Sequence, residues 1–315
     1  MGRVLVTGGA GMIGGAVARA LLGDPRFEVR ISDHRPAPQW IRESCEVHSG
    51  DLRSAEEARE AMAECTHVVH AAAVGGGIGD FEQLPHTLAE TNSALNGAMV
   101  RAALDVAVER FVYVSSSAVF ERATVVPTPE EHLLDCPAPR SAYGFSKLAG
   151  ELLCRAAGSE HDLPFSICRP WGAYGPGEPA GGEPGGTHAV GGLIAWALEG
   201  RELKAAPFDP RDTRTPTHVD DLAGGIIAAL TSPAALHEDF NLAAAGEVTL
   251  RELATMVWDA CGRGTPSLPA TKRGREPSRR HPSVAKAARL LGWRAQIDLG
   301  AGIENTVTRA RRRSP

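Results

Sequence analysis

Residues 4–14 read Val4-Leu5-Val6-Thr7-Gly8-Gly9-Ala10-Gly11-Met12-Ile13-Gly14, and this stretch decides the fold. Apolar Val4–Thr7 predicts a short buried strand, and Met12–Leu22 predicts an amphipathic helix directly after it. Gly8, Gly11 and Gly14 allow a tight turn between them, and Met12 and Ile13 open the helix with free N–H groups. Such a turn lets the backbone approach an anion closely at the helix N-terminus. The order of strand, turn and helix therefore predicts a site for a dinucleotide pyrophosphate.

The alternation of strand and helix continues through the first two-thirds of the chain. Further short apolar stretches predict strands at 28–32, 67–70, 110–115 and 165–169. Amphipathic stretches predict helices at 54–63, 89–107 and 142–157. Short apolar strands alternating with longer helices are typical of a parallel sheet covered on both faces. We therefore expect an α/β fold with a Rossmann-type, doubly wound parallel sheet.

The composition of the sequence changes at Trp171, where a Gly- and Pro-rich stretch predicts a long loop. Beyond it we expect a helix near 192–199, a strand and helix at 217–230 and a helix near 249–261. We predict that residues 1–170 form the dinucleotide-binding domain, with 217–240 returning to it. Residues 171–216 and 241–315 would form a smaller C-terminal substrate-binding lobe.

A carboxylate follows the second predicted strand. Asp33 stands where it can accept hydrogen bonds from the adenosine ribose hydroxyls of a dinucleotide. Its charge would repel a 2′-phosphate, which favours NAD over NADP. Arg35 weakens that preference because a guanidinium attracts a phosphate.

A tyrosine and a lysine share one face of the helix expected at 142–157. Tyr143 and Lys147 are four residues apart, so both side chains point the same way. A phenol titrates near pH 10, and a neighbouring ammonium lowers that pKa. Such a pair can take a proton from an alcohol while a hydride leaves the same carbon. Ser115–Ser117 ends the preceding strand, at the sheet edge where ligands bind, and a hydroxyl there could also meet the reacting group.

The composition narrows the classes of protein. The net charge of −5 gives no reason to expect nucleic acid or an anionic membrane as partner. The six cysteines form no Cys-x-x-Cys pair and no zinc-ligand spacing, so no metal site is expected. The chain shows no apolar run long enough to span a bilayer and no leader before its first strand. We expect a cytoplasmic enzyme.

Taken together, these motifs resemble the extended short-chain dehydrogenase/reductase superfamily and, within it, the NAD-dependent epimerase/dehydratase family. Further landmarks of the resemblance run along nearly the whole chain. They are Gly50–Leu52, His70–Ala73, Asn92, Val114–Ser117, Arg169–Pro170, Tyr174–Gly177, His218–Asp221 and Leu291–Trp293.

The resemblance implies roles for residues that the chain's own pattern does not assign. Asp51 and Leu52 would flank the adenine, and Ala71, Ala72 and Ala73 would line the cofactor. Asn92, Ser115 and Arg169 would join the cofactor site. Ser116 aligns best with the catalytic Ser or Thr, with Ser117 as the fallback. The implied substrate-binding residues are Gly75, Ser117, Tyr143, Gly172, Arg214 and Arg275, of which the arginines would hold a nucleotide diphosphate. For Arg275 a plain surface charge is an equal alternative.

The residues after the catalytic serine help to separate the family's reactions. Sugar 4,6-dehydratases place Asp and Glu there, uronic-acid decarboxylases keep a Glu, and GDP-sugar 3,5-epimerases a Cys. This chain has Ser117 and Ala118. The resemblance then implies a nucleotide-sugar 4-epimerase with bound NAD and with Tyr143 as acid and base. The chain departs from the family at Trp171 and Gly172, where an Asn is common, and at Glu121, where a Gly is usual.

Other interpretations remain open. An NAD(P)H-dependent keto-sugar reductase is the main alternative, and a dehydratase or decarboxylase is a further one. A regulator that kept the fold without catalysis, or a dehydrogenase of lipid-like alcohols, would be a different class. The helices expected at 89–107 and 142–157 resemble those that pair two subunits in relatives, so we expect a homodimer.

Overall fold

The computed structural model describes residues 2–75, 84–178, 184, 188–271 and 274–312. Its centre is a seven-stranded parallel sheet with the strand order β10-β6-β5-β4-β1-β2-β3. The strands are β1 (Gly2–Thr7), β2 (Phe27–Ser32), β3 (Glu46–His48), β4 (His67–His70), β5 (Arg110–Val114), β6 (Phe165–Pro170) and β10 (Asp239–Leu242). The order reverses direction at β1, so the carboxyl ends of β1 and β4 open a crevice at the switch point.

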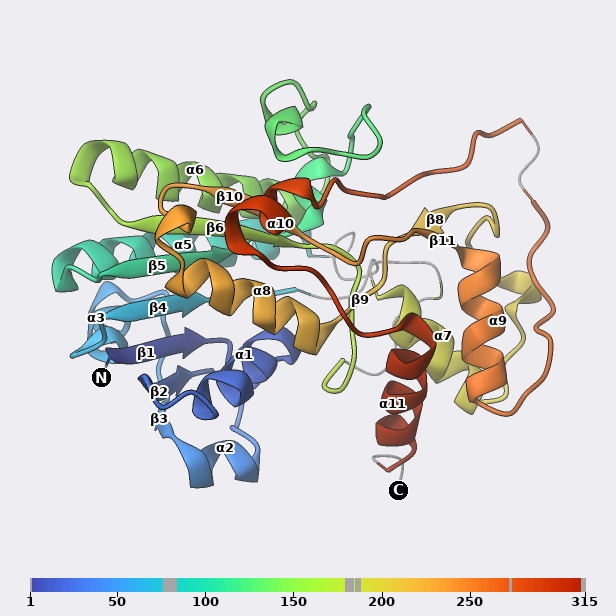
Figure 1. The fold of residues 1–315 in the computed structure, drawn as a ribbon, viewed down its shortest axis with the longest axis horizontal. Coiled ribbons are helices and arrows are strands. Elements are labelled where there is room, and N and C mark those ends of the chain that lie inside the picture. The colour runs from blue at the N-terminus through green and yellow to red at the C-terminus, as the bar shows by residue number, and fades with distance from the viewer. Residues whose placement is uncertain (1, 76–83, 179–183, 185–187, 272–273, 313–315) are drawn as a thin grey trace.

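Helices cover both faces of this sheet (Figure 1). One face packs against α1 (Met12–Leu22), α2 (Gln39–Ser44), α8 (Val219–Thr231) and α10 (Ala285–Leu291). The other face packs against α3 (Ala55–Met62), α5 (Pro85–Val106) and α6 (Ala142–His161). Each face thus has its own apolar core. The predicted Rossmann-type, doubly wound α/β fold is confirmed.

A smaller lobe lies beyond the carboxyl ends of the strands (Figure 1). Its core joins α7 (Ala189–Leu198), α9 (Leu250–Ala260) and α11 (Leu299–Arg311). Two short strand pairs lie alongside, β7 (Ala173–Tyr174) with β9 (Thr217–His218) and β8 (Thr213–Arg214) with β11 (Val248–Thr249). The 3₁₀ turns η1 (Ser117–Phe120), η2 (Glu130–Leu134), η3 (Leu203–Ala205) and η4 (Pro233–Ala235) complete the elements.

The chain passes between the two lobes more often than the sequence indicated. Helix α8 and strand β10 return to the large sheet, in the region expected to do so. Helix α10 lies in the segment assigned to the smaller lobe, yet it packs against α8 and β10. Helix α11 then returns to α7 and α9. The division into two lobes stays a prediction, with α10 placed on the large sheet.

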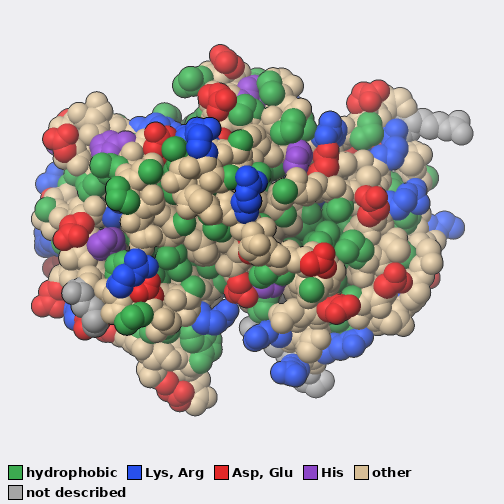
Figure 2. Space-filling model, in the orientation of Figure 1, with side chains coloured by type: hydrophobic (Ala, Val, Ile, Leu, Met, Phe, Trp, Pro, Cys, Tyr) green, Lys and Arg blue, Asp and Glu red, His purple; other side chains and the backbone are tan. Residues whose placement is uncertain are grey.

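The surface carries charges of both signs. Acidic and basic side chains are interspersed over the face in Figure 2, and basic ones gather most densely near the C-terminal end. No helix among the described residues has the length and apolar character needed to cross a membrane.

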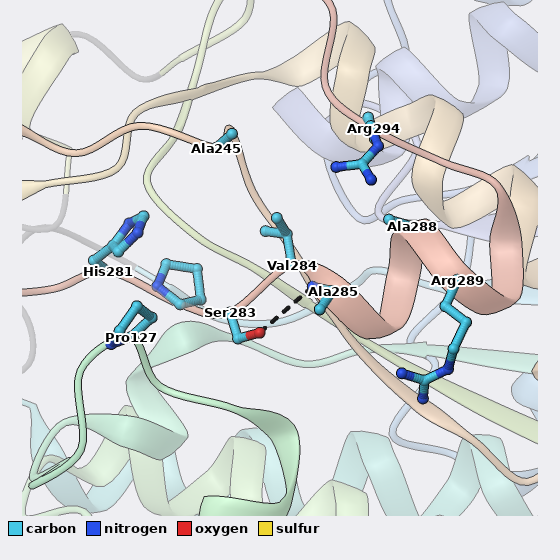
Figure 3. A pocket seen from close by; sticks show the side chains of 10 residues that line it. Pro127, Ala245, His281, Ser283, Val284, Ala285, Ala288, Arg289 and Arg294 are labelled. Carbon is cyan, nitrogen blue, oxygen red and sulfur yellow. Dashed lines mark hydrogen bonds between the residues drawn. The ribbon is translucent and has the colours of Figure 1, made fainter.

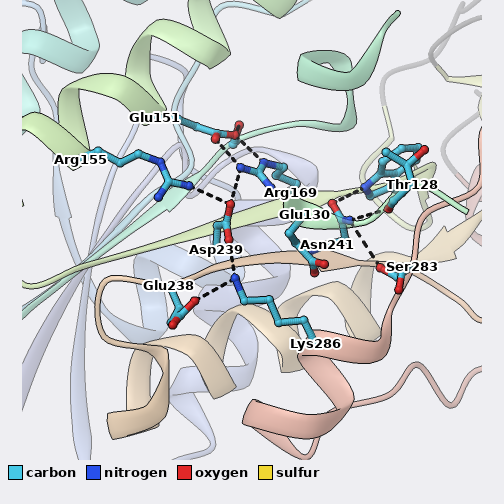
Figure 4. Close-up of polar contacts among 12 residues, drawn as sticks. Thr128, Glu130, Glu151, Arg155, Arg169, Glu238, Asp239, Asn241, Ser283 and Lys286 are labelled. Carbon is cyan, nitrogen blue, oxygen red and sulfur yellow. Dashed lines mark hydrogen bonds and ion pairs between the residues drawn. The ribbon is translucent and has the colours of Figure 1, made fainter. Parts of the chain in front are cut away.

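A buried ion network ties helix α6 to the sheet (Figure 4). Arg169 on β6 donates to Glu151 on α6 at 2.8 and 2.6 Å, and neither side chain is exposed to solvent. Arg169 also donates to Asp239 on β10 at 2.7 Å. Asp239 receives further bonds from Arg155 at 2.8 Å and from Lys286 on α10 at 2.6 Å. The network therefore joins two strands of the sheet and a helix from each of its faces.

Removal of the central cation should destabilise the fold strongly. In Arg169→Met the carboxylate of Glu151 stays buried without its partner, which typically costs about 3–5 kcal/mol. The matched control is Arg155→Met, because that side chain is partly exposed and Asp239 keeps Arg169 and Lys286. The control should lose about 1 kcal/mol or less. Urea unfolding measures both, and equal losses would contradict a central role for Arg169.

Candidate active site

The glycine-rich turn forms a cradle at the carboxyl end of β1. Gly8 has φ +69°, and a Cβ on it would lie 2.9 Å from the backbone of Ala72. A Cβ on Gly14 would lie 2.3 Å from the carbonyl oxygen of Gly8. The first glycine therefore allows the turn to meet the end of β4, and the third lets α1 pack directly on the turn.

The start of α1 fits the pyrophosphate of a dinucleotide. Gly11 is the residue before the helix, and no side chain caps the N–H groups that follow, which include those of Met12 and Ile13. Free N–H groups and the helix dipole attract an anion. Gly177 closes over this end, since a Cβ there would lie 3.5 Å from Met12 Cα. The residues present thus fit the diphosphate of NAD.

Asp33 lies at the carboxyl end of β2 as predicted, but its oxygens already have partners. It accepts hydrogen bonds from the N–H of Ala10 at 3.0 Å and from the guanidinium of Arg35 at 3.2 Å. Burial opposes ionisation of Asp33, but these bonds outweigh burial and hold its pKa below the usual range. Arg35 also stands beside Gly11, with a nitrogen 3.2 Å from the ideal Cβ position. A ribose hydroxyl that donates to Asp33 would therefore bind a carboxylate that also accepts hydrogen bonds from Arg35.

The adenine and nicotinamide sides of the predicted cofactor site follow β3 and β4. Asp51 is exposed, and hydrogen bonds from Arg53 lower its pKa to about 2. Leu52 is buried in the core. Ala71–Ala73 follow β4, and the N–H of Ala72 donates to Thr7 Oγ1 at 3.1 Å. Thr7 in turn bonds His70, so a buried polar pair fixes this segment beside the cradle.

Tyr143, Ser116 and Lys147 come together at the carboxyl end of β5. The phenol of Tyr143 hydrogen-bonds the Ser116 hydroxyl, which also accepts the N–H of Ala118 at 3.1 Å. Ser141 caps the start of α6 through Gly144, which sets the first turn carrying Tyr143. Lys147 Nζ lies 5.9 Å from the centre of the Tyr143 ring. Of the three serines, Ser116 is therefore the one that meets the phenol.

The pKa of Tyr143 differs from the value that its spacing from Lys147 led us to expect. Burial raises the pKa of Tyr143, and the bond from Ser116 only partly offsets it. The predicted lowering by Lys147 is therefore wrong for the protein alone. Burial also lowers the pKa of Lys147 to about 8, and its ammonium donates to the carbonyl of Val114 at 2.8 Å. The lysine holds the backbone at the end of β5 instead of the phenol.

Three predicted cofactor-binding residues have their partners in the interior. Asn92 exchanges hydrogen bonds with the backbone of Val74 at 2.7 and 2.9 Å. Ser115 donates to Glu151 at 2.5 Å, and Arg169 is the centre of the network described above. These side chains support the segments around the cradle. Their contact with the cofactor stays a prediction.

A pocket lies beside the catalytic group, between β6 and the smaller lobe. Its described lining is Ser117, Trp171, Gly172, Ala173, Ala189, Val190, Arg214, Thr215, Pro216 and Arg280. Three predicted substrate-binding residues, Ser117, Gly172 and Arg214, are thus brought together. Gly75 stands at the other side of the catalytic tyrosine, where a Cβ would lie 3.6 Å from the Tyr143 ring.

Gly172 stands where the resemblance led us to expect an asparagine, and the structure leaves no room there for a side chain. Its φ is +55°, and a Cβ would lie 2.3 Å from the carbonyl oxygen of Thr215. Its own carbonyl accepts the N–H of Thr217 at 2.9 Å. No side chain fits here without moving the strand pair β7 and β9.

Arg280, and not the predicted Arg275, belongs to the described lining of this pocket. The predicted Arg275 is paired with Asp212 at 2.6 Å and Asp209 at 3.2 Å and does not line the pocket. Arg280 does line it, and sequence reasoning missed it. The signal was the tandem Arg279–Arg280, but only the fold shows which of the two turns inward.

A second, wide hollow lies between Pro127, Ala245 and the segment that leads into α10 (Figure 3). It is lined by residues 127, 245, 281–285, 288, 289 and 294, among them Arg289 and Arg294. None of the predicted site residues belongs to it. The smaller pocket beside Ser117 is therefore the one that meets the catalytic group.

Comparisons with known proteins agree with this geometry. The profile of the "NAD dependent epimerase/dehydratase family" matches residues 4–243. A probable GDP-L-fucose synthase of Oryza sativa is 27% identical over 97% of this chain and 90% of its own. An uncharacterized UDP-glucose epimerase of Bacillus subtilis is 25% identical over 97% and 96%.

A solved structure has the same fold throughout. It is the UDP-glucose 4-epimerase of Thermus thermophilus in complex with NAD, with a TM-score of 0.84 and 28% identity over 98% of this chain and 99% of its own. The predicted cofactor, NAD, is confirmed for the family. A family profile over three-quarters of the chain, a cradle for a dinucleotide and a Ser–Tyr–Lys group at the strand ends lead to one conclusion. The chain belongs to the NAD-dependent epimerase/dehydratase family, within the extended short-chain dehydrogenases/reductases.

Proposed function

We propose that this enzyme is a nucleotide-sugar epimerase that inverts C4 of the sugar through a 4-keto sugar. The observation that carries the proposal is the composition of the pocket. Its described lining has two arginines and the Ser117 hydroxyl, and it contains no carboxylate, thiol or imidazole. A dehydratase or decarboxylase needs a further acid or base beside the sugar, whereas an epimerisation at C4 needs only Tyr143.

The cofactor, NAD, supplies the hydride acceptor and donor in this chemistry. Tyr143 acts as the phenolate: its oxygen takes the proton of the C4 hydroxyl, and the phenol so formed returns that proton after the keto sugar has turned. The Ser116 hydroxyl holds that phenol in place by the bond described above. Lys147 brings a positive charge to the same side of α6, which favours the phenolate that this step requires.

Two features support the binding of a nucleotide-sugar here. Arg214 lies on β8 and faces the pocket, where its guanidinium suits a diphosphate oxygen pair. Gly75 leaves room beside the Tyr143 ring because it has no side chain. The diphosphate would then lie toward the smaller lobe, with the sugar between Ser117 and Tyr143.

Arg35 favours the keto-sugar reductase as a second candidate. Its guanidinium stands beside Gly11, where it could meet the 2′-phosphate of NADP. A reductase would consume one reduced cofactor for each product molecule. An epimerase regenerates its cofactor in every turnover.

Incubation with nucleotide-sugars on uridine, guanosine and thymidine diphosphates should yield C4 epimers without net change in NADH. Proton NMR resolves the products, and absorbance at the NADH band follows the cofactor. Tyr143→Phe should lower kcat by about 10²–10⁴-fold, because it removes the acid and base, with NAD binding retained. Tyr174→Phe is the control, since that tyrosine packs in the smaller lobe's core. Stoichiometric NADH consumption would assign the enzyme as a reductase.

The buried Lys147 should give a pH-dependent stability. Its pKa is about 8 in the folded protein and 10.5 ordinarily. Between these values the unfolded chain binds the proton and the folded protein does not, so the lysine's contribution to stability rises with pH. From pH 7.5 to 9.5 the free energy of unfolding should rise by about 1–2 kcal/mol relative to Lys147→Met. Urea unfolding of both proteins without cofactor measures this, and a constant difference would contradict it.

We also propose a homodimer through α5 and α6. Three large apolar side chains on α6 are exposed, Phe145 (53%), Leu152 (58%) and Leu153 (38%), at spacings of seven and one. Leu152 and Leu153 follow Phe145 by seven and eight residues, and positions at these spacings lie on one side of a helix. An apolar stripe of this kind is typical of a subunit contact.

Charges placed in the stripe should separate the subunits. The double variant Phe145→Asp with Leu152→Asp should elute as a monomer at concentrations where the wild type is a dimer. The control is Leu134→Asp, because Leu134 is 89% exposed on η2, away from α6. Light scattering coupled to size exclusion gives the mass. A monomeric wild type would refute the dimer.

A further inference from the structure

The arginines around the pocket fall into two groups. Arg211 is paired with Asp209 at 2.8 Å, Arg275 with Asp212 at 2.6 Å, and Arg279 with Glu247. Arg280 differs from its neighbours, because no carboxylate in the described ranges lies within 4.0 Å of its guanidinium. It is also the one of these four that lines the pocket. Its charge is therefore open to a ligand there.

The inward position of Arg280 is built into the fold. Its carbonyl accepts the hydroxyl of Thr215 at 3.1 Å. On one side of it the N–H of Ser278 donates to Asp212 at 2.8 Å. On the other side the carbonyl of His281 accepts the N–H of Thr128 at 2.9 Å. The backbone around Arg280 is thus held from both sides, and its side chain enters the pocket from a fixed point.

This placement is electrostatically costly without an anion. Burial lowers the pKa of Arg280, and the charges of Glu121 and Asp212 offset this only in part. Burial also lowers the pKa of Arg214 to about 10, with the charge of Arg280 as the next cause. Two like charges share one partly buried pocket, so each disfavours the other until a negative group enters.

The two arginines share Asp212 as a charged neighbour but differ in their other charged neighbours. Arg280 has Glu121 as a charged neighbour, and Glu121 accepts the N–H and hydroxyl of Ser141, the residue that caps α6 before Tyr143. Arg214 has Asp212 and Arg275 as its other charged neighbours, on the smaller lobe. Arg280 is therefore the cation on the catalytic side, and Arg214 is the cation on the lobe side.

We infer that Arg280 binds a carboxylate carried by the sugar itself, so that the preferred substrate is a nucleotide-linked uronic acid. The inference rests on the proposed C4 chemistry at Tyr143. In a hexose ring the C5 substituent is adjacent to C4, whereas the diphosphate on C1 lies across the ring. A carboxylate at C5 would meet the cation on the catalytic side, with the diphosphate at Arg214. The guanidinium can hold both carboxylate oxygens, and the Ser117 hydroxyl can donate to one of them.

The test uses matched pairs of nucleotide-sugars that differ only in a carboxylate or a hydroxymethyl group at C5. The pairs are UDP-glucuronate with UDP-glucose, GDP-mannuronate with GDP-mannose, and dTDP-glucuronate with dTDP-glucose. Calorimetry with the NAD-loaded protein gives Kd, and NMR gives turnover. On its own nucleotide the wild type should bind the uronate at least about 10-fold more tightly than the hexose, as a charge-assisted bidentate bond provides.

Variants then separate the two arginines. Arg280→Met should raise the Kd of the nucleotide-uronate by about 30-fold or more. It should change the Kd of the neutral nucleotide-hexose by less than about 3-fold. Arg280→Lys should recover part of the uronate affinity, which also shows that the site has folded. Arg214→Met is the matched control, and it should raise the Kd of both members of a pair by the same factor.

Two results would overturn the inference: a wild type that prefers the hexose of every pair, or an Arg280→Met variant that weakens both members equally, which would assign Arg280 to the diphosphate. If no pair binds or is epimerised, the proposed function itself is refuted. Hexose epimerisation that is independent of Arg280 would retain the proposed function and reject only the uronate.

Discussion

The ion pair between Arg169 and Glu151 holds the catalytic helix to the sheet, and the rest of the site depends on it. Tyr143, Lys147 and Glu151 follow one another at intervals of four along α6, so they form a single row on one face. Glu151 at the inner end of the row is held by Arg169 on β6 and by Ser115, which directly follows β5. Lys147 bonds the end of β5, and Tyr143 at the outer end reaches Ser116. The position of the phenol is thus set by charges buried two turns away.

The arginines of the smaller lobe differ in whether they have a carboxylate partner. Where Asp209, Asp212 and Glu247 supply carboxylates, the guanidiniums stay at the rim and fasten loops. Arg214 and Arg280 instead turn toward the pocket, where burial lowers the pKa of both. A pocket with this charge selects for anionic ligands before any shape is considered. The acidic overall charge of the chain hides this local excess of positive charge.

How much the sequence predicts varies with the range of the interactions involved. The strands at β1, β2, β4, β5 and β6 and the pair Tyr143–Lys147 follow from local periodicity, and they lie where predicted. The choice of Ser116 from three serines depends on where η1 turns, which the alignment indicated and the geometry supports. The three-residue β3, the mixed-polarity β10 and the helix α10 gave too weak a local signal. The sequence also does not show that Arg169 and Asn92 have internal partners at Asp239 and Val74, because these contacts join segments that are separated along the chain. Arg280 was missed for the same reason, since the pairing of its neighbours is a property of the fold.

The position of Asp239 has a consequence for how the chain folds during its synthesis on the ribosome. Its partners are Arg155, Arg169 and Lys286, and β10 itself closes the edge of the sheet beside β6. All residues of the catalytic group have been synthesised by residue 147, yet the network that holds their helix lacks its last members for about another 140 residues. A nascent chain therefore carries all the catalytic side chains before the ion network that holds their helix is complete. Only when the C-terminal segment has emerged and α10 has docked does the catalytic helix gain its full set of buried partners.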